Sequence, residues 1–249
     1  MTKLVGILNV TPDSFSDGGK YTNVQRAIDH AEEMFHDGAS IVDVGAESTR
    51  PNARELTPEE EWQRLEPVLK VLIKKYPGKI SLDSYHPETV KKAFKIGPVI
   101  VNDVTGMNNP LMVDAVIALN ARTIISHLSG TNIQLAHRLM PIKSVNRVKN
   151  DLLEREVELI SRGLDKHQII LDPGIGFGKT PEVNKKLLRF AELLPDHSIM
   201  IGYSRKRFLG DRRMELQPNL DAGRIAIASG ANYLRVHDVA GHKLLINKN

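Results

Sequence analysis

The chain contains no cysteine, no long apolar run and no large excess of charge of either sign. The absence of Cys among 249 residues excludes disulfides, thiol nucleophiles and Cys-ligated zinc, so any metal needs oxygen or imidazole ligands. It also suits a cytoplasmic protein. No segment approaches the roughly 20 apolar residues of a membrane-spanning helix, and the start, Lys3-Leu4-Val5, has no secretory apolar region. We therefore expect an untargeted protein with no membrane partner.

The charge is only mildly basic, with 34 Lys and Arg residues against 30 Asp and Glu residues. Basic pairs such as Lys74-Lys75 and Arg212-Arg213 are scattered among acids, which is typical of solvated helix surfaces rather than of a nucleic-acid-binding stripe. We expect no nucleic-acid partner. A slightly basic balance would suit a small anionic substrate.

Short apolar segments rich in β-branched residues recur along the chain. Most are continuous rather than alternating, as in parallel strands that are covered on both faces. The predicted strands are residues 4–8, 40–44, 79–82, 99–101, 122–125, 168–171, 198–201 and 233–236.

Amphipathic helical stretches, including residues 24–35, 59–75 and 149–162, lie between the predicted strands. Thr57-Pro58-Glu59-Glu60 has the residues of a capped helix start, and the glycines of HDGAS and SRGLD are typical of helix ends. Eight strands alternating with helices predict a single-domain (β/α)8 barrel, of the TIM-barrel type, over residues 1–249. A doubly wound open sheet is the alternative.

Each predicted strand is followed by a polar group. In a barrel, the C-terminal strand ends converge on one mouth, where binding sites are built. Any single residue of this kind could equally be a helix cap or an Asx-turn, but eight together favour a site. The strand-end residues are Asn9, Asp43 with Glu47, Asp83, Asn102 with Asp103, His127, Asp172, Ser204 with Lys206, and His237 with Asp238.

Two groups of these residues suggest two ends of one ligand. Asp83, Asn102 and Asp172 would accept hydrogen bonds from a flat heterocycle of the aminopyrimidinone type, and Lys206 would pair with a buried carboxylate. Basic residues after strands two, seven and eight would hold a phosphate or diphosphate, with Asn9 as an oxygen ligand to Mg²⁺. The alternatives are a structural Asp–Lys pair, and structural roles for His237 and His127.

The segment LDPGIGFGKT, residues 171–180, resembles a nucleotide-binding loop but lacks the glycines that either standard phosphate motif needs. Its glycines would instead let the backbone pass close to a flat ligand. The long polar segment that contains Phe15 and ends at Gly18-Gly19 would cover the diphosphate end of the site. The sequence shows neither the Ser-His-Asp order of a hydrolase nor the His-x-x-x-His spacing of a zinc protease.

Seven ordered motifs resemble those of the dihydropteroate synthase family over essentially the whole chain. They are NVTPDSFSDGG (9–19), ESTRP (47–51), LDS (82–84), VND (101–103), LDPGIGFGKT (171–180), SRKR (204–207) and RVHD (235–238). Two departures are SHLSGTN (126–132), where the family has a Met-His-Met-x-Gly-x-Pro type of segment, and Arg207, where some relatives have Ser.

The resemblance implies a dimeric barrel that condenses 6-hydroxymethyl-7,8-dihydropterin diphosphate with 4-aminobenzoate, using Mg²⁺ and a dissociative mechanism. It assigns three groups of residues. The pterin group is Asp83, Asn102, Asp172, Phe177, Gly202 and Lys206; the diphosphate group is Asn9 (also metal), Arg50, Arg235 and His237; the 4-aminobenzoate group is Phe15, Asp17, Thr49, Pro51 and Arg207. A methyltetrahydrofolate-dependent methyltransferase domain is the main alternative, although it would not need the long first loop or the anion site. A catalytically silent pterin-binding homologue is the other.

Overall fold

The computed structural model describes residues 1–11, 20–48, 53–130, 133–136 and 139–246. An eight-stranded sheet with parallel pairing forms its centre, in the order β6-β5-β4-β3-β2-β1-β8-β7. The strands are β1 (Lys3–Asn9), β2 (Ala39–Gly45), β3 (Ile80–Asp83), β4 (Ile100–Asp103), β5 (Thr123–Ser126), β6 (Ile169–Asp172), β7 (Met200–Ile201) and β8 (Tyr233–Val236).

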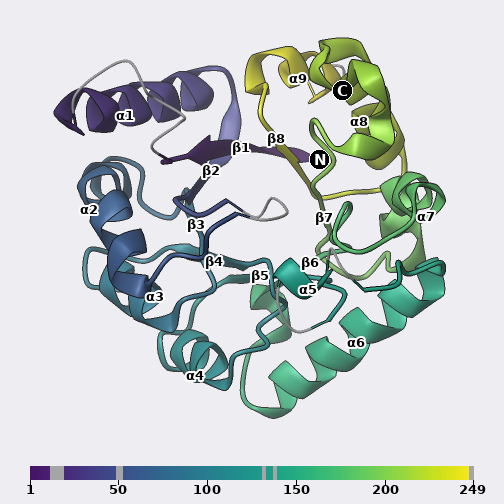
Figure 1. Ribbon diagram of the computed structural model, residues 1–249, viewed down its shortest axis with the longest axis horizontal. Helices are drawn as coiled ribbons and strands as arrows, with labels where there is room; N and C mark the ends of the chain where they lie inside the picture. The colour runs from purple at the N-terminus through teal and green to yellow at the C-terminus, as the bar shows by residue number, and fades with distance from the viewer. Residues whose placement is uncertain (12–19, 49–52, 131–132, 137–138, 247–249) are drawn as a thin grey trace.

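Helices surround the sheet as an outer ring (Figure 1). The α-helices are α1 (Lys20–His36), α2 (Pro58–Lys75), α3 (Pro87–Phe94), α4 (Pro110–Ala118), α5 (Ile133–Ala136), α6 (Val145–Ser161), α7 (Pro181–Lys186), α8 (Leu216–Ala228) and α9 (Val239–Ile246). The 3₁₀ helices are η2 (Lys166–Gln168), η3 (Leu187–Leu193), η4 (Arg207–Leu209) and η5 (Asp211–Met214).

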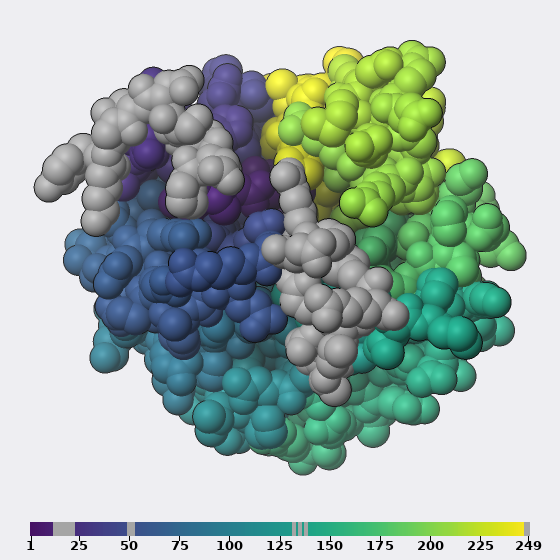
Figure 2. Space-filling model, in the orientation of Figure 1, coloured from purple at the N-terminus to yellow at the C-terminus, as the bar shows by residue number. Residues whose placement is uncertain are grey.

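The sheet closes into a barrel at two places. β1 pairs with β8, so that the first and last parts of the chain lie side by side (Figure 2). On the other side, Leu171 forms an isolated parallel bridge with Ile199, and the Leu171 N–H donates to the Ser198 carbonyl at 2.9 Å. The (β/α)8 prediction is confirmed, and this closed order excludes the doubly wound alternative.

Local signals set the helix boundaries as the sequence predicts. The Thr57 hydroxyl accepts from the Glu60 N–H at 3.2 Å, and the Glu60 carboxylate accepts from the Thr57 N–H at 3.0 Å, which completes a capping box. α1 and α6 end just before Gly38 and Gly163, whose φ angles of 108° and 107° favour glycine.

No helix among the described residues is long and apolar enough to cross a membrane.

The barrel interior is filled by a layer of side chains, separate from the larger core between strands and helices. This layer consists of Val5, Ile41, Ile100, Ile124, Ile170, Met200 and Tyr233. On β3 the corresponding position is taken by the buried residue Ser81, two residues before Asp83. Because side chains two residues apart in a strand point to the same face, the next interior layer towards the mouth is fixed by sequence. Its members are Ile7, Asp43, Asp83, Asn102, Ser126, Asp172, Gly202 and Arg235, most of which are polar.

Candidate active site

Arg235 connects three strands at the base of the mouth. Its Nε donates to Asp43 Oδ2 at 2.6 Å, and its Nη2 donates to Asp83 Oδ2 at 2.5 Å. The Asn102 amide adds a fourth strand, because its Nδ2 donates to the same Asp43 oxygen at 2.9 Å. Residues far apart in the sequence therefore share one buried polar network. Within this network Asp83 forms its ion pair with Arg235.

The electrostatics of this network favour a ligand that donates hydrogen bonds. Burial raises the pKa of Asp83 to about 7, although the Arg235 charge opposes the rise. Burial lowers the pKa of Arg235, but Asp43 and Asp83 outweigh it and leave that pKa above its usual value. Among the described residues, Asp43 Oδ1 and Asn102 Oδ1 are buried without a hydrogen-bond partner. Such atoms are costly unless donors reach them.

The opposite wall comes from β6 and the segment after β7. Asp172 Oδ1 accepts from the Gly174 N–H at 2.8 Å, which fixes the carboxylate at the strand end. A Cβ atom at Gly202 would lie 3.4 Å from Asp172 Oδ2, 3.8 Å from Lys206 Nζ and 3.8 Å from the Arg235 Cβ. Gly202 therefore lies next to the Asp172 carboxylate and the side chains of Lys206 and Arg235.

Lys206 lies between a carbonyl and an aromatic ring. Its Nζ donates to the Ile175 carbonyl at 2.5 Å and lies 5.1 Å from the centre of the Phe177 ring. Burial lowers the pKa of Lys206 to about 8, and Asp172 opposes this shift. Burial also raises the pKa of Asp172, which Lys206 opposes in turn. Lys206 can therefore change protonation near neutral pH, as is common for groups in binding and catalytic sites.

The glycine-rich segment after β6 is held in place by Lys179, whose role the sequence analysis missed. Its Nζ donates to the carbonyls of His127, Gly174 and Phe177 at 3.1, 2.8 and 2.9 Å, and only 7% of the residue is exposed. Burial lowers the pKa of Lys179 to about 7. Gly174 has a φ angle of 62°, and a Cβ there would lie 2.0 Å from the His127 carbonyl oxygen. This segment is thus fixed to the end of β5.

The remaining predicted site residues either follow the strand ends or lie outside the part of the chain that the structure describes. His237 follows β8, where its N–H and Nδ1 lie 3.3 and 3.0 Å from the Ser204 hydroxyl oxygen. Asn9 ends β1 with an exposed side chain, and Arg207 is exposed at the start of η4. Five predicted residues lie outside the described residues: Phe15, Asp17, Thr49, Arg50 and Pro51.

Asp43 and Asp103 both stand at strand ends in the sequence, but they have different roles in the structure. Asp43 is part of the Arg235 network, and the interior layer would have identified it, because it stands two residues after Ile41. Asp103, next to Asn102, is instead capped by Thr105: its Oδ1 accepts from the Thr105 N–H and hydroxyl, both at 2.7 Å. Burial still raises the pKa of Asp103 to about 6.

His127 has the structural role that the sequence analysis left open. It is buried, and its Nε2 lies 3.2 Å from Asp151 Oδ2 on α6. Burial lowers its pKa to about 4. Its carbonyl, rather than its ring, contacts the glycine-rich segment through Lys179.

Together these residues can bind a flat, nitrogen-rich ring and stabilise charge on it. The acids and Asn102 offer acceptors to ring N–H groups, Lys206 offers a donor, and the Phe177 ring adds an apolar surface near that donor. Carboxylates in a buried site also stabilise positive charge that develops on a bound ring.

Comparison with known proteins agrees with this chemistry. A family model for pterin binding enzymes matches residues 5–237. The dihydropteroate synthase of Bacillus subtilis (strain 168) is 37% identical over 247 residues, covering 96% of this chain and 84% of that protein. The dihydropteroate synthase of Neisseria meningitidis serogroup C is 39% identical over 252 residues, covering 95% and 88%.

Solved structures show the same similarity in three dimensions. Xanthomonas albilineans dihydropteroate synthase with 4-aminobenzoic acid aligns with a TM-score of 0.88 and 34% identity, covering 99% of this chain and 91% of that one. The same enzyme in complex with 7,8-dihydropteroate aligns with a TM-score of 0.85 and 32% identity, covering 99% and 92%. Similarity of sequence and of fold over nearly its whole length places this chain in the dihydropteroate synthase family of pterin-binding enzymes.

Proposed function

We propose that this protein joins 6-hydroxymethyl-7,8-dihydropterin diphosphate to 4-aminobenzoate, and so forms 7,8-dihydropteroate and diphosphate in folate biosynthesis. The observation that carries the proposal is the polar interior layer, in which Asp83, Asn102, Asp172 and Arg235 come from four strands and meet Lys206 at one mouth. This layer has the acceptors and the donor that a pterin edge needs.

In the proposed binding mode, the pterin lies over the Arg235 network. Asn102 Oδ1 and the Asp172 carboxylate accept from its N–H groups, and Lys206 donates to its carbonyl oxygen. The buried oxygen of Asn102 then gains the partner that it lacks among the described residues. Phe177 and Gly202 border the ring.

The proposed reaction is a dissociative substitution at the pterin methylene carbon. The bond from this carbon to the diphosphate oxygen breaks first and leaves a cation that is delocalised into the dihydropterin ring. The aniline nitrogen of 4-aminobenzoate then forms the new C–N bond and loses a proton. Asp83 and Asp172 stabilise the cation from fixed positions, so no protein nucleophile is needed.

The diphosphate would lie at the rim, near Asn9, Arg50 and His237, with Arg235 below it. Mg²⁺ fits this proposal, because Asn9 ends β1 at the mouth with an exposed side chain and an amide oxygen is a hard ligand. The ion, when bound, would neutralise charge on the departing diphosphate. Asn9 and the diphosphate oxygens are the groups that would hold it.

The 4-aminobenzoate would bind on the outer side of the pterin. We assign its pocket to Phe15, Asp17, Thr49, Pro51 and Arg207. Of these, Arg207 lies among the described residues, on the same 3₁₀ turn that follows Lys206. This assignment places the amine on the side of the methylene carbon that faces the mouth.

The test is steady-state turnover with the dihydropterin diphosphate, 4-aminobenzoate and Mg²⁺, following diphosphate and 7,8-dihydropteroate together. The proposal predicts that both products form at equal rates and that sustained diphosphate release requires the amine. Diphosphate release at the same rate without the amine would contradict the proposed transfer. No turnover under these conditions would favour the silent pterin-binding homologue.

Two further expectations accompany the proposal. We infer a homodimer and a cytoplasmic location, both from the family resemblance. Light scattering during size-exclusion chromatography measures the mass in solution, for which two 27.8 kDa chains are expected. Fractionation of the source cells tests the location.

A further inference from the structure

A compact group of potential metal ligands lies outside the polar interior layer. It consists of Glu47 after β2, Glu61 on α2 and His86 immediately before α3. One ligand atom from each residue lies within 4.8 Å of the other two. Glu61 is fully buried, and the side chains of Glu47 and His86 are 6% and 14% exposed. The proposed condensation has no role for this group.

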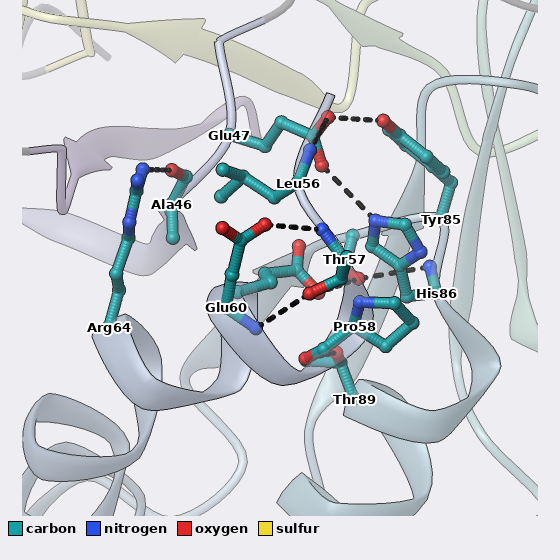
Figure 3. A network of polar contacts seen from close by, with 12 residues as sticks. Ala46, Glu47, Leu56, Thr57, Pro58, Glu60, Arg64, Tyr85, His86 and Thr89 are labelled. Carbon is teal, nitrogen blue, oxygen red and sulfur yellow. Dashed lines mark hydrogen bonds and ion pairs between the residues drawn. The ribbon is translucent and has the colours of Figure 1, made fainter. Parts of the chain in front are cut away.

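Each carboxylate in this group has one oxygen held by a neighbour. Glu47 Oε1 accepts from the Leu56 N–H at 3.1 Å and from the Tyr85 hydroxyl, as Figure 3 shows. Glu61 Oε2 accepts from the Ser84 hydroxyl at 2.8 Å. Outer hydrogen bonds of this kind orient the first ligands of a metal site.

Of the two other carboxylate oxygens, one is paired with the imidazole and the other has no hydrogen-bond partner among the described residues. Glu47 Oε2 lies 3.2 Å from His86 Nε2. Glu61 Oε1 is buried and has no hydrogen-bond partner among the described residues. A carboxylate oxygen in that position is costly, because it has lost water without gaining a donor. A bound cation would remove this cost and balance two carboxylates that face one imidazole.

Distance and ligand type indicate which cation would fit. In a tetrahedral site with bonds of about 2.0 Å, neighbouring ligand atoms are about 3.3 Å apart. The Glu47–His86 separation of 3.2 Å is close to this value, and the separations that involve Glu61 are at most 4.8 Å. Imidazole together with carboxylates suits zinc and similar first-row metals, whereas magnesium prefers oxygen ligands and retained water.

We propose that Glu47, Glu61 and His86 bind a divalent transition-metal ion of the Zn²⁺ type, with solvent as the remaining ligand. The bound ion would tie the segment after β2 to the first turn of α2 and to the segment between β3 and α3. The site is separate from the Mg²⁺ expected beside the diphosphate. The competing explanation is an ion pair in which His86 keeps its proton between the two acids.

The test is Zn²⁺ binding by the full chain after removal of metals with a chelator, in the presence of excess Mg²⁺. Calorimetry and metal analysis should give one tightly bound Zn²⁺ per chain. His86→Gln and Glu61→Gln, which nearly preserve shape, should each weaken binding at least tenfold. The control is His167→Gln, an exposed histidine distant in sequence from the cluster, which should leave that site unchanged.

Co²⁺ provides a second readout. The wild-type chain with one Co²⁺ should show visible d–d absorption of tetrahedral or five-coordinate intensity, and His86→Gln should lose it. The proposal is overturned if the wild-type chain takes up no stoichiometric Zn²⁺, or if both variants bind it as tightly as the wild type. If His86→Gln does not fold, as judged by circular dichroism, the Glu61→Gln result decides.

Discussion

The anchoring of the glycine-rich segment by Lys179 allows a quantitative test. Lys179→Met keeps most of the side-chain volume but removes the donor to three carbonyls at 2.8 to 3.1 Å. A buried acceptor that loses its partner costs about 1–3 kcal/mol, so three such losses cost about 3–9 kcal/mol. The variant also avoids burying an ammonium group. Because burial lowers the pKa of Lys179 to about 7, keeping its charged ammonium group in the folded protein costs about 4–5 kcal/mol at neutral pH.

The two effects leave a net loss of about 2 kcal/mol in the free energy of unfolding at pH 7, near the middle of the range. The assay is urea denaturation of wild type, Lys179→Met and the control Lys186→Met, whose lysine is exposed on α7. The control should lie within about 0.5 kcal/mol of wild type. A Lys179 variant as stable as wild type at pH 9, where the cost of the buried ammonium has fallen to about 2 kcal/mol, would refute the anchoring role.

The stability difference between wild type and Lys179→Met should also change with pH in a defined direction. The folded pKa of Lys179 lies below its unfolded value, so its stabilising contribution is complete at high pH and falls as pH falls through the folded pKa. Lys179→Met lacks this dependence. The difference between wild type and variant should therefore grow by about 2 kcal/mol from pH 7 to pH 9. A difference that shrinks over this interval would contradict the burial of a charged ammonium.

Three further predictions concern the mouth. Asp83→Asn and Lys206→Ala should each lower kcat/KM at least tenfold, about 1.4 kcal/mol, and wild-type kinetics in both would disprove the assigned pocket. The kcat/KM profile should rise with pH as Asp83 ionises near 7 and fall as Lys206 deprotonates near 8. Asp83→Asn should lose the rise on the acid side of the profile, which checks the assignment of that step to Asp83. Gly174→Ala should lower Tm far more than Gly78→Ala: both φ angles are positive, but only at Gly174 would a Cβ meet a carbonyl, that of His127, at 2.0 Å. Equal effects would contradict the close packing.

Much of the fold follows directly from the sequence. The eight apolar segments, the alternation with amphipathic stretches and the capping box at Thr57 each correspond to observed elements, because they depend on contacts close in the chain or on burial of a whole strand. Gly38 and Gly163 end helices for the same local reason. The number of alternating elements predicts the closed strand order, and the β1–β8 pairing confirms it.

The partners within the mouth depend on strand stagger, which local patterns do not define. Asp83 aligns with Gly45 rather than with Asp43, so the Arg235 guanidinium can reach both acids at once. That arrangement could not be deduced from the position of each acid at a strand end. The role of Lys179 was missed for a similar reason, because its partners are backbone carbonyls, which carry no sequence signal.

The proposed function requires one pterin pocket formed by these strand ends, and binding of 6-hydroxymethylpterin measured by calorimetry tests this pocket most directly. Wild type and Asp196→Asn, a substitution at an exposed acid, should bind one pterin per chain with equal affinity. Asp172→Asn should bind at least tenfold more weakly, about 1.4 kcal/mol, while retaining its fold. Equal pterin affinity in wild type and Asp172→Asn would contradict the account.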